Sequence, residues 1–150
     1  MSAYAASMSA RPGSAHGFTL VELMFAVAIV GILVAVAYPT FTQQISKSRR
    51  ADAKSTLLGC AQMLERYNTQ SGNYSAATDA AVTSACVGTT KNGYYSLPGG
   101  NIPTTAGAGT FLIQATPLGR QAGDACGTFS YTQDGTKGVS GATLASASCW

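Results

Sequence analysis

The chain has 150 residues, which is room for one small domain and one membrane helix. Only 10% of the residues are charged and the formal net charge is +3, a balance too mild to indicate nucleic-acid binding by itself. The sequence contains no Gly-x-x-x-x-Gly-Lys phosphate-binding loop, so it does not indicate an NTPase.

The chain begins with seventeen residues that are mostly small and polar, followed by a long apolar run. Between Phe18 and Ser46 the only charged side chain is Glu22, so this run exceeds the roughly twenty residues that a transmembrane helix needs. A carboxylate inside a membrane segment costs roughly 2.5 kcal/mol or more and usually faces a partner. No cation lies within a helical turn or two of Glu22, so we expect its partner to come from elsewhere.

Gly17, Phe18, Thr19, Leu20 and Glu22, together with the apolar run, resemble the processing site of type IV prepilins and related pseudopilins. The resemblance implies that a membrane-embedded prepilin peptidase cuts between Gly17 and Phe18 and methylates the new amino group of Phe18. It also implies that mature subunits pack their N-terminal helices into a filament core, in which Glu22 meets the Phe18 amine of a neighbour.

This resemblance divides the chain into a cleaved leader (1–17), a transmembrane and filament-core helix (18–46) and a periplasmic or extracellular head (47–150). We expect one helix from Phe18 to about Gln70, interrupted by Gly31 and Pro39. Proline removes a backbone hydrogen bond and clashes with the preceding turn, which predicts a kink or a melted turn over 35–39.

The second half of this helix is amphipathic. Four- and three-residue steps place an apolar stripe on one face, which we expect to cover a domain core: Ala53, Leu57, Cys60, Leu64 and Tyr67.

A basic cluster (Lys47, Arg49, Arg50 and Lys54) follows the apolar run, and it would place this side in the cytoplasm. The four cysteines of the chain are even in number and indicate disulfides, which form in an oxidising space outside the cytoplasm. We therefore expect this side of the helix to lie outside the cytoplasm. We expect the cluster to face solvent or lipid headgroups, with nucleic-acid contact as the alternative.

The head carries strand signals after a loop over 71–92 with room for one short helix. Strands are expected at 94–97, 110–116 and 128–132, then a turn at Asp134-Gly135 and a short last strand at 137–140. The fold class is therefore α+β, with three or four antiparallel strands on the apolar face of the helix, as in the type IV pilin fold. We expect Trp150 to pack on the sheet.

Cysteines at positions 60, 86, 126 and 149 lack a C-x-x-C spacing, which argues against zinc, and their even number indicates two disulfides. Three pairings exist, and we expect Cys60 with Cys86 and Cys126 with Cys149, partly because each pair closes a moderate loop. The resemblance supports the second pair, since type IVa pilins bound a C-terminal loop in this way.

The residues and the resemblance together predict a structural subunit of a type IV pilus, in a minor role, and not an enzyme. No catalytic residues, cofactor or metal are expected: the single histidine, His16, leaves with the leader, and the acids of the head lack paired spacing. The expected partners are other pilin subunits, the prepilin peptidase and methyltransferase, the pilus assembly machinery and the inner membrane, followed by export into an extracellular fibre that serves motility, adhesion or DNA uptake.

Three alternatives stay open at this stage. They are a type II secretion pseudopilin, a monomeric signal-anchored domain with an uncut N-terminus, and a DNA-uptake receptor. The receptor would use Lys91, Arg120 or Lys137 on the head to contact DNA or another anion.

Overall fold

The computed structural model describes residues 17–76, 78–103 and 107–150, so the expected leader lies outside it except for Gly17. One helix, α1 (Leu20–Ser71), crosses from a first unit that ends at Thr40 into a second that spans Phe41–Trp150. The two units are described separately.

The first unit contains the apolar part of α1, and none of the residues in this part is buried within the described chain. By length and composition α1 is the one helix of the described residues that could cross a membrane. The helix continues without a break through Pro39, so the melted turn expected over 35–39 is absent from this form of the chain.

The second unit begins with the amphipathic half of α1, which covers the core of the head as predicted. Its buried positions are Ala53, Leu57, Cys60, Ala61 and Leu64, and Tyr67 packs half-buried against the same core. Four of the predicted stripe residues, Ala53, Leu57, Cys60 and Leu64, are fully buried. They lie on one face of α1 because they follow one another in helical steps of three and four.

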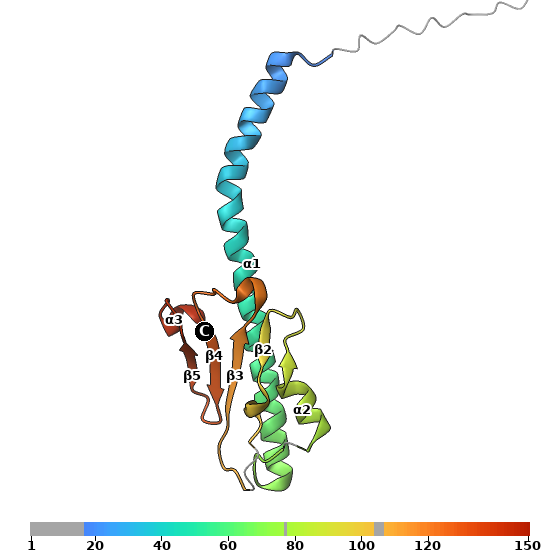
Figure 1. Cartoon of the computed structure of the whole chain (residues 1–150), viewed down its shortest axis with the longest axis vertical. Coiled ribbons are helices and arrows are strands. Elements are labelled where there is room, and N and C mark those ends of the chain that lie inside the picture. The colour runs from blue at the N-terminus through green and yellow to red at the C-terminus, as the bar shows by residue number, and fades with distance from the viewer. Residues whose placement is uncertain (1–16, 77, 104–106) are drawn as a thin grey trace, which may run out of the picture. The chain divides into compact units, whose positions relative to one another are not determined.

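The sheet is a five-stranded antiparallel meander in the order β1-β2-β3-β4-β5 (Figure 1). Its strands are β1 (Gly88–Thr89), β2 (Tyr95–Leu97), β3 (Leu112–Pro117), β4 (Thr128–Thr132) and β5 (Lys137–Ser140). The α+β class is confirmed, and so are the four strands read from the sequence. The fifth, β1, lies in the expected loop and has only two residues, too few for alternation to be visible.

A short helix, α2 (Ala80–Cys86), forms within the loop predicted to have room for one. The carboxylate of Asp79 accepts hydrogen bonds from the backbone N–H groups of Ala81 and Val82, at 2.9 and 3.0 Å. This cap satisfies donors at the helix start that have no partner within the helix.

The two disulfides join the expected pairs, Cys60 with Cys86 and Cys126 with Cys149. The first ties α2 to α1, and the second ties the loop before β4 to the last helix, α3 (Ser146–Cys149).

Trp150 packs on the sheet, as predicted. Its ring lies edge-on to Phe129 with centroids 5.6 Å apart, and its indole N–H donates to the backbone oxygen of Gly138 at 2.8 Å. Phe129 is fully buried, so Trp150 closes the aromatic side of the core.

Two short 3-10 turns, η1 (Gly99–Asn101) and η2 (Gly119–Gln121), flank β3.

Candidate functional site

The expected processing site lies in exposed backbone just before α1. Gly17 has no atom within 4 Å of the position that a Cβ would occupy, and Phe18 is 82% exposed. Because the helix starts only at Leu20, the Gly17–Phe18 peptide bond is outside regular structure. A peptidase that needs extended substrate backbone could therefore reach this bond without unwinding the helix.

Thr19 caps the start of α1, a structural role that the sequence reasoning missed. Its hydroxyl oxygen accepts a hydrogen bond from the backbone N–H of Glu22 at 3.2 Å, and its carbonyl accepts from the N–H of Leu23 at the same distance. The signal was the T-x-x-E spacing of a capping box ahead of an apolar run. Glu22 thus lies in the first turn of α1, where the helix dipole favours a negative charge.

The apolar half of α1 presents large hydrophobic side chains in every direction around the helix. Their exposed fractions run from 56% at Val30 to 75% at Leu20 over residues 20–36. Gly31 and Pro39 also lie in this half, Gly31 with no neighbouring atom within 4 Å of a built Cβ. Exposed apolar surface of this extent indicates a lipid or protein partner that the described chain does not supply.

The basic cluster was expected to be a solvated or headgroup face, and for three of its four members that interpretation is wrong. The Nε of Arg50 donates to both carboxylate oxygens of Asp124, at 2.9 and 3.0 Å, and the side chains are only 15% and 2% exposed. Tyr95 donates its hydroxyl to the same carboxylate at 2.8 Å. These contacts join α1, β2 and the loop before β4.

The environment of this network shifts two pKa values in opposite directions. Burial opposes ionisation of Asp124, but the hydrogen bonds from Arg50 and Tyr95 outweigh it and hold the Asp124 pKa below its usual value. Burial, and then the hydrogen bond to Asp124, raise the pKa of Tyr95. Asp124 is therefore ionised at neutral pH, as its ion pair with Arg50 requires. Tyr95 is protonated, as its hydrogen-bond donation to Asp124 requires.

Two more cations of the cluster also bind the head. The guanidinium of Arg49 lies 3.8 Å from the centroid of the Tyr94 ring and donates to the side chain of Gln121 at 3.3 Å. The ammonium of Lys54 donates to the backbone oxygen of Cys149 at 2.8 Å. Lys47 alone is exposed and makes no hydrogen bond or ion pair within the described residues.

The three cations expected to contact anions do not gather at one place. Lys91 lies in the turn between β1 and β2, and Arg120 lies in η2, directly after β3. A hydrogen bond of 2.8 Å from Leu118 N–H to the Tyr94 carbonyl joins these two segments at one end of the sheet.

Lys137 begins β5 at the opposite end of the sheet, where it pairs with Tyr131. Its ammonium lies 5.5 Å from the centroid of the Trp150 ring. All three side chains are exposed, and none forms an ion pair within the part of the chain that the structure describes.

Two family models match this chain. One is described as "Type IV minor pilin ComP, DNA uptake sequence receptor" and matches residues 39–130, which is more than half of the chain. The other, the prokaryotic N-terminal methylation motif, matches residues 13–38 and so covers the expected processing site.

Similar proteins include the type IV major fimbrial protein FimA of Dichelobacter nodosus, 40% identical over 81 residues that make up 54% of this chain and 49% of FimA. Fimbrial protein EcpC of Eikenella corrodens is 35% identical over 53% of this chain and 49% of its own length. The chain thus spans about half the length of the curated relatives it matches.

Among solved structures, a type IV pilin from Shewanella oneidensis matches 70% of this chain and 97% of its own, with 30% identity and a TM-score of 0.48. The matched families and curated relatives are structural pilins and not enzymes.

Proposed function

Because the chain belongs to the type IV pilins, in the family described as type IV minor pilin ComP, DNA uptake sequence receptor, we propose that it is a minor subunit of a type IV pilus. The observation that carries this proposal is the apolar half of α1, which the described chain leaves unburied. Such a surface is stable only in a bilayer or among other helices of the same kind.

Maturation precedes assembly in this proposal. A prepilin peptidase cuts between Gly17 and Phe18 and methylates the Phe18 amine. The match of residues 13–38 to the N-terminal methylation motif supports this step, as does the exposed, non-helical backbone at the two residues. The subunit then waits in the inner membrane with its head in the periplasm, where the disulfides can form.

Assembly moves the apolar helix from lipid to a filament core. In the membrane Glu22 bears the cost of a carboxylate in hydrocarbon, roughly 2.5 kcal/mol or more if it stays charged. In the fibre it meets the Phe18 amine of a neighbouring subunit. A buried charge tolerates few docking positions, so this pair sets the register between subunits. Inner-membrane assembly machinery and other pilins are the partners, and the extracellular fibre is the product.

The test compares two glutamates. Glu22→Gln removes the charge from the apolar helix, whereas Glu65→Gln makes the same change on the head, where an amide oxygen can still accept the hydrogen bond of Tyr74. We expect wild-type amounts of both variants in the membrane fraction, and at least a tenfold loss of Glu22→Gln from sheared surface fibres. Normal incorporation of Glu22→Gln would refute the register role.

Mass spectrometry of the N-terminus tests the maturation step separately. The expected product begins at a methylated Phe18, and fibres whose subunits retain the first seventeen residues would overturn the pilin proposal in favour of a signal-anchored domain. Co-purification with a secretion complex instead of a surface fibre would indicate a type II secretion pseudopilin.

DNA binding by the head is the second candidate function, because the matched family is described as a DNA uptake sequence receptor and its match covers most of the head. Lys91 and Arg120 lie at one end of the sheet, free of ion pairs with the described residues, and could contact successive phosphates. Lys137 lies at the other end and is the natural control.

The experiment measures binding of a short DNA duplex at several salt concentrations. Each phosphate contact contributes about one unit to the slope of log affinity against log salt. The double variant Lys91→Gln/Arg120→Gln should make that slope less steep by about two units. Lys137→Gln should leave the slope unchanged. Absence of any salt-dependent binding by the wild-type chain at low salt would remove this candidate.

A further inference from the structure

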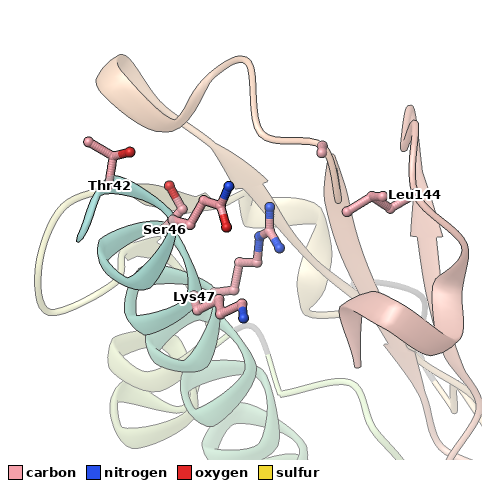
Figure 2. Close-up of a pocket in the computed structure, with 7 residues that line it drawn as sticks. Thr42, Ser46, Lys47 and Leu144 are labelled. Atoms are coloured by element: carbon pink, nitrogen blue, oxygen red, sulfur yellow. The ribbon is translucent and has the colours of Figure 1, made fainter. Parts of the chain in front are cut away.

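A hollow of about 410 Å³ lies between α1 and the C-terminal loop (Figure 2). It lies wholly within the second unit and is lined by Thr42, Gln43, Ser46, Lys47, Arg50, Ala125 and Leu144. Figure 2 shows Thr42 one turn of α1 before Ser46 and Lys47, with the side chain of Leu144 directed back toward the helix. Helical steps of three and four place the α1 residues on one face.

The lining offers hydrogen-bond donors and positive charge but no carboxylate. Two hydroxyls and one amide come from α1, together with the ammonium of Lys47 and the guanidinium of Arg50. The charge of Arg50 is already compensated by Asp124, whereas Lys47 has no ion pair within the described residues. The hollow therefore carries one uncompensated positive charge beside neutral donors, a combination that suits a phosphate group.

The position of the hollow along the chain indicates where such a phosphate comes from. Leu20 to Phe41 is long enough, at 1.5 Å per residue, to cross the roughly 30 Å of bilayer hydrocarbon. The hollow starts with the next residue, Thr42, so it would lie in the headgroup layer. Leu144 and Ala125 add an apolar wall, which a soluble anion would not need.

We propose that this hollow binds the headgroup phosphate of an anionic phospholipid, such as phosphatidylglycerol, while the subunit is stored in the membrane. The inference rests on the proposed membrane insertion of α1. Lys47 donates to the phosphate, the hydroxyl of Ser46 adds a neutral donor, and Leu144 contacts the glycerol and the first acyl carbons. This accounts for the one cation of the basic cluster that the head does not use.

The test uses the full mature chain in mixed micelles with equal amounts of phosphatidylglycerol and phosphatidylcholine, and native mass spectrometry counts the bound lipids. One lysine near a membrane surface contributes about a fivefold preference for anionic lipid. We expect about that preference for the wild-type chain, its loss in Lys47→Gln, and its retention in Lys137→Gln, which removes the same charge at the far end of β5.

Three results would overturn the inference. They are an unchanged preference in Lys47→Gln, an equal loss in both variants, which would indicate general charge attraction, and full displacement of the lipid by equimolar inorganic phosphate, which would indicate a soluble anion. Carbonate extraction of the same chain from vesicles separates this inference from the proposed function. A chain that is extracted contradicts membrane storage, whereas a chain that stays inserted without a lipid preference contradicts only the headgroup site.

Discussion

The two halves of α1 continue one helical backbone but differ in what surrounds their apolar side chains. In residues 20–40 large hydrophobic side chains are more than half exposed in the described chain, whereas Leu57 and Leu64 in the second half are fully buried against the head. The second half is also held by an ion pair through Arg50 and a disulfide through Cys60.

This contrast separates the stability of the subunit from its assembly. Substitutions in the second half should change the unfolding free energy of a single subunit, because their partners belong to the same chain. Substitutions in the first half should leave that free energy unchanged and act only when lipid or other subunits supply the contacts. Trp150, the single tryptophan, packs on Phe129 and can report on unfolding of the head.

A matched pair of leucines gives the largest expected difference. Leu57 is 0% exposed and Leu33 is 63% exposed. Leu57→Ala removes core contacts and leaves a cavity, which should lower the unfolding free energy of the head by about 3–4 kcal/mol. Leu33→Ala should change it by less than about 0.5 kcal/mol. Urea unfolding of the full chain in micelles, followed by Trp150 fluorescence, measures both, and similar losses would contradict the separation.

The Cys60–Cys86 disulfide ties the second half of α1 to α2. Replacing both cysteines by alanine frees the unfolded chain of a closed loop, so the head should lose about 3 kcal/mol. The same urea titration measures the loss, and reductant should destabilise the wild-type head at least as much, because it also breaks the Cys126–Cys149 disulfide. An unchanged midpoint would mean that packing alone holds this half of the helix.

The Arg50–Asp124 pair should contribute less, because Arg50 keeps some access to water. Asp124→Asn should cost about 2 kcal/mol at neutral pH. The Asp124 pKa is lowered by folding, so its contribution is present above the unfolded value near 4 and is lost as the pH falls through the lower folded pKa. The difference between wild type and Asp124→Asn should therefore shrink below about pH 4. A constant difference down to pH 2 would exclude the ion pair as its cause.

The sequence predicted those features whose signals are local. Helical steps revealed the buried stripe from Ala53 to Leu64, and alternation revealed β3 and β4. The basic cluster was misread because the partner of Arg50 is 74 residues away, in a loop of small residues whose proximity no local pattern indicates. A run of charges on a helix usually faces solvent, and here three of four turn toward the head.

The candidate sites also divide into those with a local sequence signal and those that depend on the fold. The spacing of Gly17, Phe18 and Glu22 marked the processing segment, and the T-x-x-E pattern would have added Thr19 as its cap. The hollow beside Lys47 could not be predicted, because Ala125 and Leu144 reach it only through the fold of the C-terminal loop. The placement of Lys91 and Arg120 at one sheet end likewise depends on strand order, which appears only in the structure.

Two glycines of α1, one in each half, test the same contrast with the smallest expected change in unfolding free energy. Gly59 lies in the second half of α1 and Gly31 in the first, and neither has an atom within 4 Å of a built Cβ, so alanine fits at both without a clash. Alanine favours a helix over glycine by about 0.5–1 kcal/mol. Gly59→Ala should therefore raise the unfolding free energy of the head by about that amount, since this turn of α1 unfolds together with the core.

Gly31→Ala should leave the unfolding free energy of the head unchanged in the same urea titration. It should raise only the helical circular dichroism signal that persists after the head unfolds. Equal stabilisation by both variants would show that the two halves unfold as one cooperative unit, and the burial of apolar side chains in the second half alone argues against that.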